Sequence, residues 1–195
     1  MTKTIQPPGG SRGKSRPRSP WRWAGFAVAP LALAVLVAFS VLSETDDATV
    51  EQAIPFELSA TDGRTVSLEE SLAQGDALLY FSMGVGCDGC FAQIPEIEAA
   101  VAERGITLVP IMVDPAPLVA AEASRFGIES PILIDPEAQV SAAYGMVGIY
   151  GHGDRPSHSF ALVRQGGEIA WVRHYAEMFV PAGALIEELD AALDS

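Results

Sequence analysis

Apolar and polar positions alternate in regular blocks along the chain after residue 52. Short apolar runs typical of buried strands are followed by segments whose apolar residues recur at helical spacing. This pattern predicts strands at 55–58, 65–67, 77–82, 106–113, 131–134, 159–164 and 168–174. It predicts helices starting at 68, running from the turn at 87–90 to about 103, and at 116–126, 136–144 and 181–193. Strands alternating with helices indicate an α/β domain with a parallel-containing sheet covered on both faces, and a hairpin at one edge.

A different pattern, an uncharged apolar segment, occupies residues 23–42. Its length is sufficient for a helix that spans about 30 Å of hydrocarbon. Trp21 and Trp23 lie where interfacial aromatic residues are expected, and membrane helices tolerate a proline such as Pro30. We therefore expect a retained transmembrane anchor. A cleaved signal peptide is the alternative, although the apolar run is long for one and no clean A-x-A site follows it.

The charge distribution predicts how this anchor is oriented. Six of the 12 basic residues precede residue 23, whereas all 25 acidic residues follow residue 43. Residues 1–22 are then a basic cytoplasmic arm, residues 43–52 a polar linker and residues 53–195 an extracytoplasmic domain at the cell membrane. Because the part after residue 42 carries six basic and 25 acidic side chains, it should repel nucleic acid and anionic membrane surfaces.

The candidate chemistry lies at the two cysteines of the chain, Cys87 and Cys90, in the turn between strand 77–82 and the next helix. A helix N-terminus favours an anion, so the pKa of the Cys87 thiol should be lowered. Asp88 opposes this effect because a carboxylate disfavours a neighbouring thiolate. Such a C-x-x-C motif is typical of thioredoxin-like redox sites, with Cys87 as the attacking thiol and Cys90 as the resolving one.

The cysteine pair could also have a structural or a metal-binding role. A purely structural disulfide would close a very small loop and would restrict the unfolded chain little. A zinc site would need His152, His158 or His174, at spacings unlike those of a zinc finger. The glycine-rich loop 145–157 lacks a phosphate-binding spacing, and we expect no cofactor.

Several short motifs appear in a characteristic order over about residues 53–190. They are PFEL at 55–58, DGRTVSL at 62–68, the C-x-x-C core, IDP at 134–136, AYG at 143–145, FALV at 160–163 and GGEI at 166–169. This order resembles the redoxin branch of the thioredoxin-like superfamily. That branch includes the alkyl hydroperoxide reductase/thiol-specific antioxidant group and membrane-anchored thiol–disulfide oxidoreductases. The resemblance implies a thioredoxin-like three-layer sandwich with a central mixed sheet, and redox chemistry at the cysteines.

The resemblance is incomplete at the peroxidase motif. Peroxiredoxins carry Pro-x-x-x-Thr/Ser-x-x-Cys, whereas the matching positions here hold Tyr80, Gly84 and Cys87. The hydroxyl that would orient a peroxide is absent, so a peroxiredoxin-type peroxidase is the less favoured alternative. Thioredoxins usually carry Trp before the first cysteine, and here that residue is Gly86.

The family also places a cis-proline loop against the cysteines, with the proline three residues before the strand phenylalanine. Here that position holds Ser157, and Pro156 lies one residue away. A cis Pro156 that serves through a local bulge and an ordinary trans proline are both open, since cis bonds are essentially confined to X–Pro.

His158 lies in the same loop and should approach the sulfurs if the family topology holds. We expect a partly exposed histidine that is hydrogen-bonded to backbone, ahead of a modulator of the dithiol. Cys87, Cys90 and His158 also resemble the copper site of Sco-type chaperones, which carry C-x-x-x-C. A copper-binding or delivery module is therefore the alternative function, because thiolates and imidazole suit copper.

Together these features predict a single-span, extracytoplasmic thiol–disulfide oxidoreductase. Its partners would be disulfide- or thiol-containing exported proteins and a redox partner.

Overall fold

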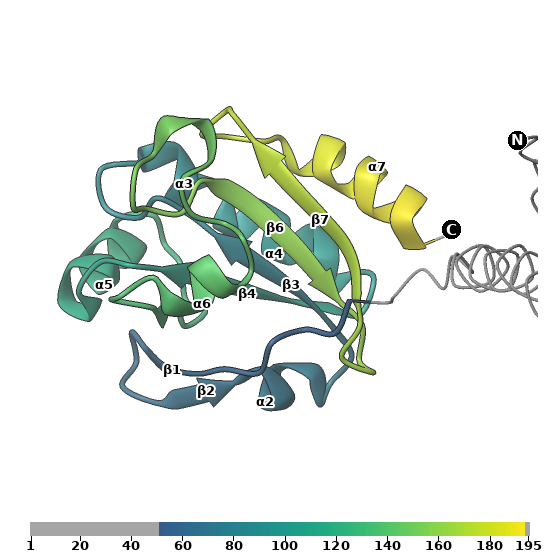
Figure 1. Ribbon diagram of the computed structural model, residues 1–195. Coiled ribbons are helices and arrows are strands. Elements are labelled where there is room, and N and C mark those ends of the chain that lie inside the picture. Colours follow the sequence, from purple (N-terminus) through teal and green to yellow (C-terminus); the bar gives the residue numbers. More distant parts are fainter. Residues whose placement is uncertain (1–50, 194–195) are drawn as a thin grey trace, which may run out of the picture. The chain divides into compact units, whose positions relative to one another are not determined.

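A mixed sheet runs through the part of the chain that the computed structural model describes, residues 51–193 (Figure 1). The strand order is β2-β1-β5-β4-β3-β6-β7. The strands are β1 (Glu57–Ala60), β2 (Thr65–Ser67), β3 (Asp76–Phe81), β4 (Ile106–Met112), β5 (Leu133–Ile134), β6 (His158–Val163) and β7 (Ile169–Tyr175).

Parallel and antiparallel pairs coexist in this sheet, which confirms the predicted mixed topology. The central strand β3 is parallel to β4, and β4 is parallel to β5. On its other side β3 is antiparallel to β6, and β6 forms the predicted edge hairpin with β7. Strand β1 pairs antiparallel with both β2 and β5.

The helices follow the predicted order, with one difference at the cysteine turn. They are α2 (Leu68–Leu72), α3 (Asp88–Ala92), α4 (Ile94–Ala102), α5 (Ala116–Arg125), α6 (Gln139–Ala143), the 3-10 turn η1 (Ile149–Gly151) and α7 (Ala182–Leu193). The single helix predicted from the cysteine turn to about residue 103 is divided at Gln93, which ends α3 and caps α4. Pro95 lies in the first turn of α4, the helical position that tolerates a missing N–H.

Alternate residues of β3 enter two separate hydrophobic clusters, one on each face of the sheet. Leu78 and Tyr80 belong to a cluster with buried residues of α4, α5 and α7. Ala77, Leu79 and Phe81 belong to a cluster with buried residues of α2, against which the α6 segment packs. Because both faces are covered, β3 is apolar along its length, as its sequence indicates.

The start of the described chain joins the edge hairpin. Ile169 N–H donates to the carbonyl of Glu51, and Ala53 N–H donates to the carbonyl of Gly167, both at 2.8 Å. The last two residues of the predicted linker, 51–52, therefore add backbone pairing to the fold. The predicted arm at 1–22 and anchor at 23–42 lie outside the described residues, and no helix within 51–193 is long and apolar enough to span a membrane.

The packing of α4 against the sheet leads to a stability prediction. Ile97 is completely buried on α4, so Ile97→Ala should lower the free energy of unfolding by about 2–5 kcal/mol. Leu118, 52% exposed on α5, offers a control whose change to Ala should cost less than about 0.5 kcal/mol. Urea unfolding of the two variants, followed by circular dichroism, measures the difference. Equal losses would show that α4 does not pack as described.

Candidate active site

The two cysteines lie at the start of α3, at the end of the sheet where three connecting segments meet. In Figure 1 the loop after α6 and the segment between β7 and α7 lie at the same end as α3. Cys87 and Cys90 form a disulfide with Cα atoms 5.3 Å apart. Cys87 is the N-cap of α3, and its sulfur accepts a hydrogen bond from Cys90 N–H at 3.2 Å.

The two sulfur-bearing residues differ in access to solvent in the order that the sequence predicts. Cys87 retains 6% of its surface, whereas Cys90 retains none. Both residues are buried, and Cys87 is the less completely buried of the two.

The loop that leads from β3 to Cys87 is held by an ion pair that sequence reasoning missed. Asp114, just after β4, accepts a hydrogen bond from Val85 N–H at 2.7 Å and pairs with the Arg155 guanidinium. Arg155 also donates through Nε to the Met83 carbonyl at 3.0 Å. No local sequence pattern links these positions, because they come from different connections of the fold.

The Asp114 carboxylate, paired with Arg155, leaves no space for a side chain at Gly84. The residue has φ +81°, and a Cβ there would clash with Asp114 Oδ2. The threonine or serine of the peroxidase motif therefore cannot occupy this position while Asp114 stays in place. The departure from the peroxidase pattern is thus accompanied by a different local structure.

Asp88 points to solvent and forms an ion pair with Arg125 at the end of α5. Arg125 also pairs with Glu122 at 2.9 Å and lies over the ring of Phe126. The guanidinium offsets part of the negative charge of Asp88. The effect of Asp88 against a Cys87 thiolate should therefore be weaker than the sequence alone suggests.

His158 is fully buried, so the expectation of a partly exposed histidine bonded to backbone is wrong. It is the first residue of β6, and its ring packs against Tyr80 and Phe160. Its Nδ1 lies 3.9 Å from Cys90 Sγ and 3.3 Å from Tyr80 Oη. Burial lowers the pKa of His158 to about 4, which keeps the ring neutral at pH 7.

Gln93 and Tyr80 complete a buried polar cluster with His158. The Gln93 amide nitrogen lies 2.6 Å from Tyr80 Oη and 2.7 Å from His158 Nε2, while its oxygen accepts from Val180 N–H at 3.0 Å. The Tyr80 hydroxyl donates to the Cys90 carbonyl at 3.2 Å, and burial raises the pKa of Tyr80. Sequence reasoning missed both residues. Gln93 could have been noticed as a polar residue four positions before Ile97, on the buried face of the helix.

Pro156 is buried and trans, since residues 51–193 contain no cis peptide bond. It forms an isolated bridge with Val147, which ties the two ends of the glycine-rich loop together. The ordinary trans proline is therefore the correct one of the two possibilities left open by the sequence.

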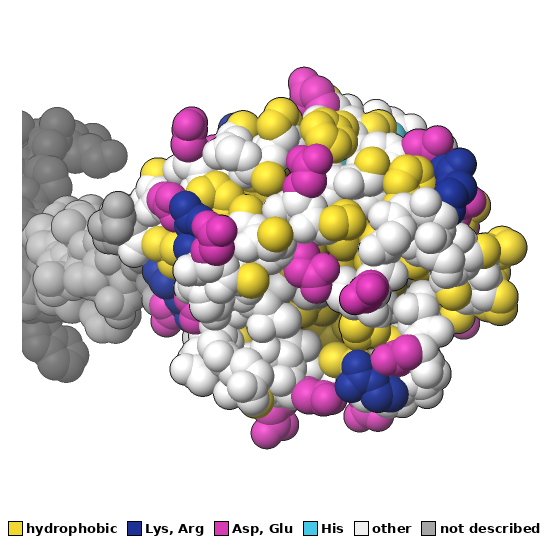
Figure 2. Space-filling view, turned by 180° about the vertical axis from the view of Figure 1, so that it is seen from behind, with side chains coloured by type: hydrophobic (Ala, Val, Ile, Leu, Met, Phe, Trp, Pro, Cys, Tyr) yellow, Lys and Arg dark blue, Asp and Glu magenta, His cyan; other side chains and the backbone are white. Residues whose placement is uncertain are grey.

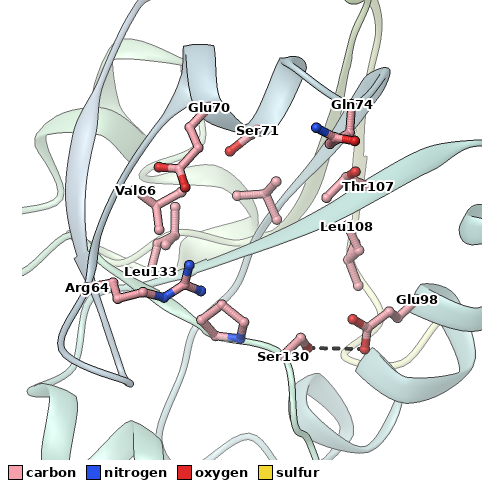
Figure 3. A pocket seen from close by; sticks show the side chains of 12 residues that line it. Arg64, Val66, Glu70, Ser71, Gln74, Glu98, Thr107, Leu108, Ser130 and Leu133 are labelled. Atoms are coloured by element: carbon pink, nitrogen blue, oxygen red, sulfur yellow. Dashed lines mark hydrogen bonds between the residues drawn. The ribbon is translucent and has the colours of Figure 1, made fainter.

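A separate pocket of about 240 Å³ lies between α2, β2 and β4 (Figure 3). Its floor includes Val66, Leu108 and Leu133, and its rim includes Arg64 and Glu98. It contains neither cysteine nor His158, so it is not part of the candidate active site.

Acidic side chains do not gather into a patch on the face of the domain drawn in Figure 2. Within residues 51–193, no group of three or more His, Cys, Asp or Glu side chains is arranged to hold a metal ion.

Residues 48–178 match the Redoxin family. The chain belongs to the redoxin family. No curated protein matches the chain. Together with the Cys87–Cys90 disulfide, the family makes this redoxin a thiol redox oxidoreductase.

Solved structures of other redox proteins share the fold. Peroxidoxin BcpB from Mycobacterium tuberculosis superposes with a TM-score of 0.61 at 22% identity, over 74% of this chain and 94% of that one. AhpC from Enterococcus faecalis has a TM-score of 0.61 at 20% identity, over 73% and 90%. A Bacteroides thetaiotaomicron protein, named as a candidate disulfide isomerase, has a TM-score of 0.57 at 23% identity, over 75% and 90%. At these identities the likeness concerns the fold.

The neutral, buried His158 predicts a loss of stability in mild acid. The unfolded chain takes up a proton near the ordinary histidine pKa of 6.5, whereas the folded chain does so only near pH 4. This contribution is complete above pH 6.5 and is lost as the pH falls towards 4. Between pH 7 and pH 5 it should remove about 2 kcal/mol from the free energy of unfolding.

Urea unfolding at several pH values measures this loss, with His158→Asn as the matched control. The variant lacks the titrating ring, so its stability should fall by about 2 kcal/mol less over the same interval. Equal slopes for the two proteins would contradict a neutral buried His158.

Proposed function

We propose that this redoxin is an extracytoplasmic thiol–disulfide oxidoreductase that exchanges disulfides with other exported proteins. The observation that carries the proposal is the Cys87–Cys90 disulfide, in which Cys87 retains 6% of its surface and Cys90 retains none. Cys87 is the attacking thiol and Cys90 the resolving thiol. A redox partner returns the pair to its starting state.

The reaction proceeds by two exchanges at sulfur. The Cys87 thiolate attacks a substrate disulfide, one substrate sulfur leaves as thiolate, and a mixed disulfide forms at Cys87. The Cys90 thiolate then attacks Cys87 Sγ, which releases the second substrate thiolate and forms the Cys87–Cys90 disulfide. The substrate gains an electron pair that the dithiol loses, and the opposite direction reverses each step.

The surroundings of the disulfide favour a protein as substrate. Phe179 is 43% exposed, and its backbone segment packs directly on α3. A Cβ at Gly89 would lie 2.7 Å from the Met178 carbonyl oxygen and 3.4 Å from Phe179 Cβ. An exposed aromatic side chain beside the cysteines can contact the apolar residues around a substrate cysteine.

The sequence supports the location of this activity. Residues 23–42 are long and apolar enough to anchor the chain, and the basic residues before them favour a cytoplasmic N-terminus. The domain would then lie in a compartment where disulfides form and persist. The predicted linker, residues 43–52, would supply the tether.

The assignment of the two cysteine roles predicts the behaviour of two single-cysteine variants. The full-length chain, purified in mild detergent, should reduce insulin in the presence of dithiothreitol. Cys90→Ser should retain attack by Cys87 but not resolution, and should therefore accumulate mixed disulfides with exported proteins. Cys87→Ser should accumulate few, because Cys90 is sealed from solvent. Non-reducing electrophoresis after acid quenching measures both.

The same preparation discriminates the alternatives. Equal trapping by both variants would contradict the assigned roles. Efficient hydroperoxide reduction without insulin turnover would favour the peroxidase, and tight stoichiometric Cu(I) binding without turnover would favour the copper module. Either result would replace the proposed function.

The location has its own test. A reporter fused after Ser195 that is active only outside the cytoplasm should give signal, and the fusion should sediment with membranes. The matched control is the fusion with residues 23–42 deleted, which should lose both properties. Release of a shortened soluble fusion would show that the apolar segment is cleaved.

A further inference from the structure

The burial of Cys90 creates a problem that the resolving cysteine must solve. When a thiolate attacks Cys87 Sγ, the S–S bond breaks and its electron pair stays on Cys90 Sγ. That residue has no exposed surface, so water cannot hydrate the new charge. A buried anion is strongly disfavoured unless hydrogen-bond donors face it.

The orientation of Gln93 is set by backbone. Val180 N–H can only donate, so the atom that it faces at 3.0 Å is the Gln93 amide oxygen. The Gln93 NH₂ group is thereby directed at Tyr80 Oη, 2.6 Å away, and at His158 Nε2, 2.7 Å away. Turning the amide over would place two donors against each other at Val180.

This orientation selects one form of the histidine ring. The Gln93 amide nitrogen lies 2.7 Å from Nε2 and 3.4 Å from Nδ1, so the nearer nitrogen, Nε2, is the better placed acceptor, and a neutral ring then carries its hydrogen on Nδ1. The opposite tautomer would face the Gln93 amide with a second donor at 2.7 Å. His158 therefore does not serve as the base that deprotonates Cys90 through Nδ1.

The Nδ1–H group has two neighbouring acceptors, and the Gln93 amide nitrogen, 3.4 Å away, is a third polar neighbour that cannot accept its hydrogen. In the disulfide form Tyr80 Oη lies 3.3 Å and Cys90 Sγ 3.9 Å from Nδ1. The titratable side chains against the ring are Tyr80 from β3, Cys90 from α3 and Tyr175 from β7, none of which carries charge in the oxidised protein at pH 7.

We propose that His158, held in its Nδ1–H form by Gln93, donates this hydrogen to the Cys90 thiolate and so stabilises the reduced state of the resolving cysteine. This inference rests on the proposed function, which makes Cys90 the buried leaving group. The two sulfurs then each have a donor, because Cys87 Sγ already accepts from Cys90 N–H. Gln93 acts through His158 and is a positioning residue.

The proposal is tested on Cys90 alone, in full-length chains that carry Cys87→Ser. Because the chain has two cysteines, the thiolate absorbance at 240 nm in this background reports Cys90, after subtraction of the chain with both cysteines changed to Ser. His158→Leu removes the donor with similar volume, and His158→Asn keeps an N–H near the position of Nδ1. The pKa of Cys90 should rise by about one to two pH units with Leu, and clearly less with Asn.

A second measurement does not depend on the stability of the variants. A two-bond ¹H–¹⁵N spectrum of the oxidised wild-type chain should show His158 protonated at Nδ1, with its signals assigned by their loss in His158→Asn. The Nε2–H form would overturn the proposal, and so would a Cys90 pKa that is equal in the Leu and wild-type backgrounds or equally raised by Leu and Asn.

Insulin turnover distinguishes a failure of the proposed function from a failure of the proposed role of His158. If the wild-type chain turns over insulin but His158→Leu leaves the Cys90 pKa unchanged, the role of His158 is contradicted and the proposed function stands. If the Cys90 pKa rises in His158→Leu but the wild-type chain does not turn over insulin, His158 is the donor and the proposed function is contradicted.

Discussion

The buried hydrogen bonds that run from Val180 through Gln93 to His158 and Tyr80 are the constraint on which the active site depends. They join the segment before α7, the break between α3 and α4, the start of β6 and the central strand β3. An unpaired buried polar group costs about 1–3 kcal/mol, so these elements must dock in the one arrangement that pairs all of them. Cys90, whose carbonyl accepts from Tyr80, is placed by the same arrangement.

A second set of contacts, on the other side of the disulfide, positions Cys87. Asp114 and Arg155 hold the loop that precedes it, and the space taken by Asp114 limits position 84 to glycine. A redoxin fold can carry peroxidase or disulfide-exchange chemistry, and this loop decides which side chains reach the first cysteine. Here position 84 is glycine and supplies no hydroxyl.

The break between α3 and α4 connects these features to the packing of the domain. Gln93 lies at the break, where its side chain turns inward and remains fully buried. An uninterrupted helix from Cys87 onward is what the apolar spacing predicts. The sequence contains Pro95, but a proline in a first helical turn and a proline within a helix have the same local pattern. In the folded chain, the contacts of Gln93 with Val180 and Tyr80 accompany the break, which places Pro95 in the first turn of a new helix.

The sequence by itself determined the order of strands and helices, the redoxin resemblance and the cysteine pair, because these depend on local periodicity and on motif spacing. It also assigned Cys87 to the start of the helix and Cys90 to its first turn, and the residue at the helix start is the less completely buried of the two. The burial of His158, the trans Pro156, the Asp114–Arg155 ion pair and the contact between Gln93 and His158 were decided by the tertiary structure. Each of these features depends on groups that lie far apart in the chain. Contacts between such groups produce no periodic pattern in the sequence from which they could be predicted.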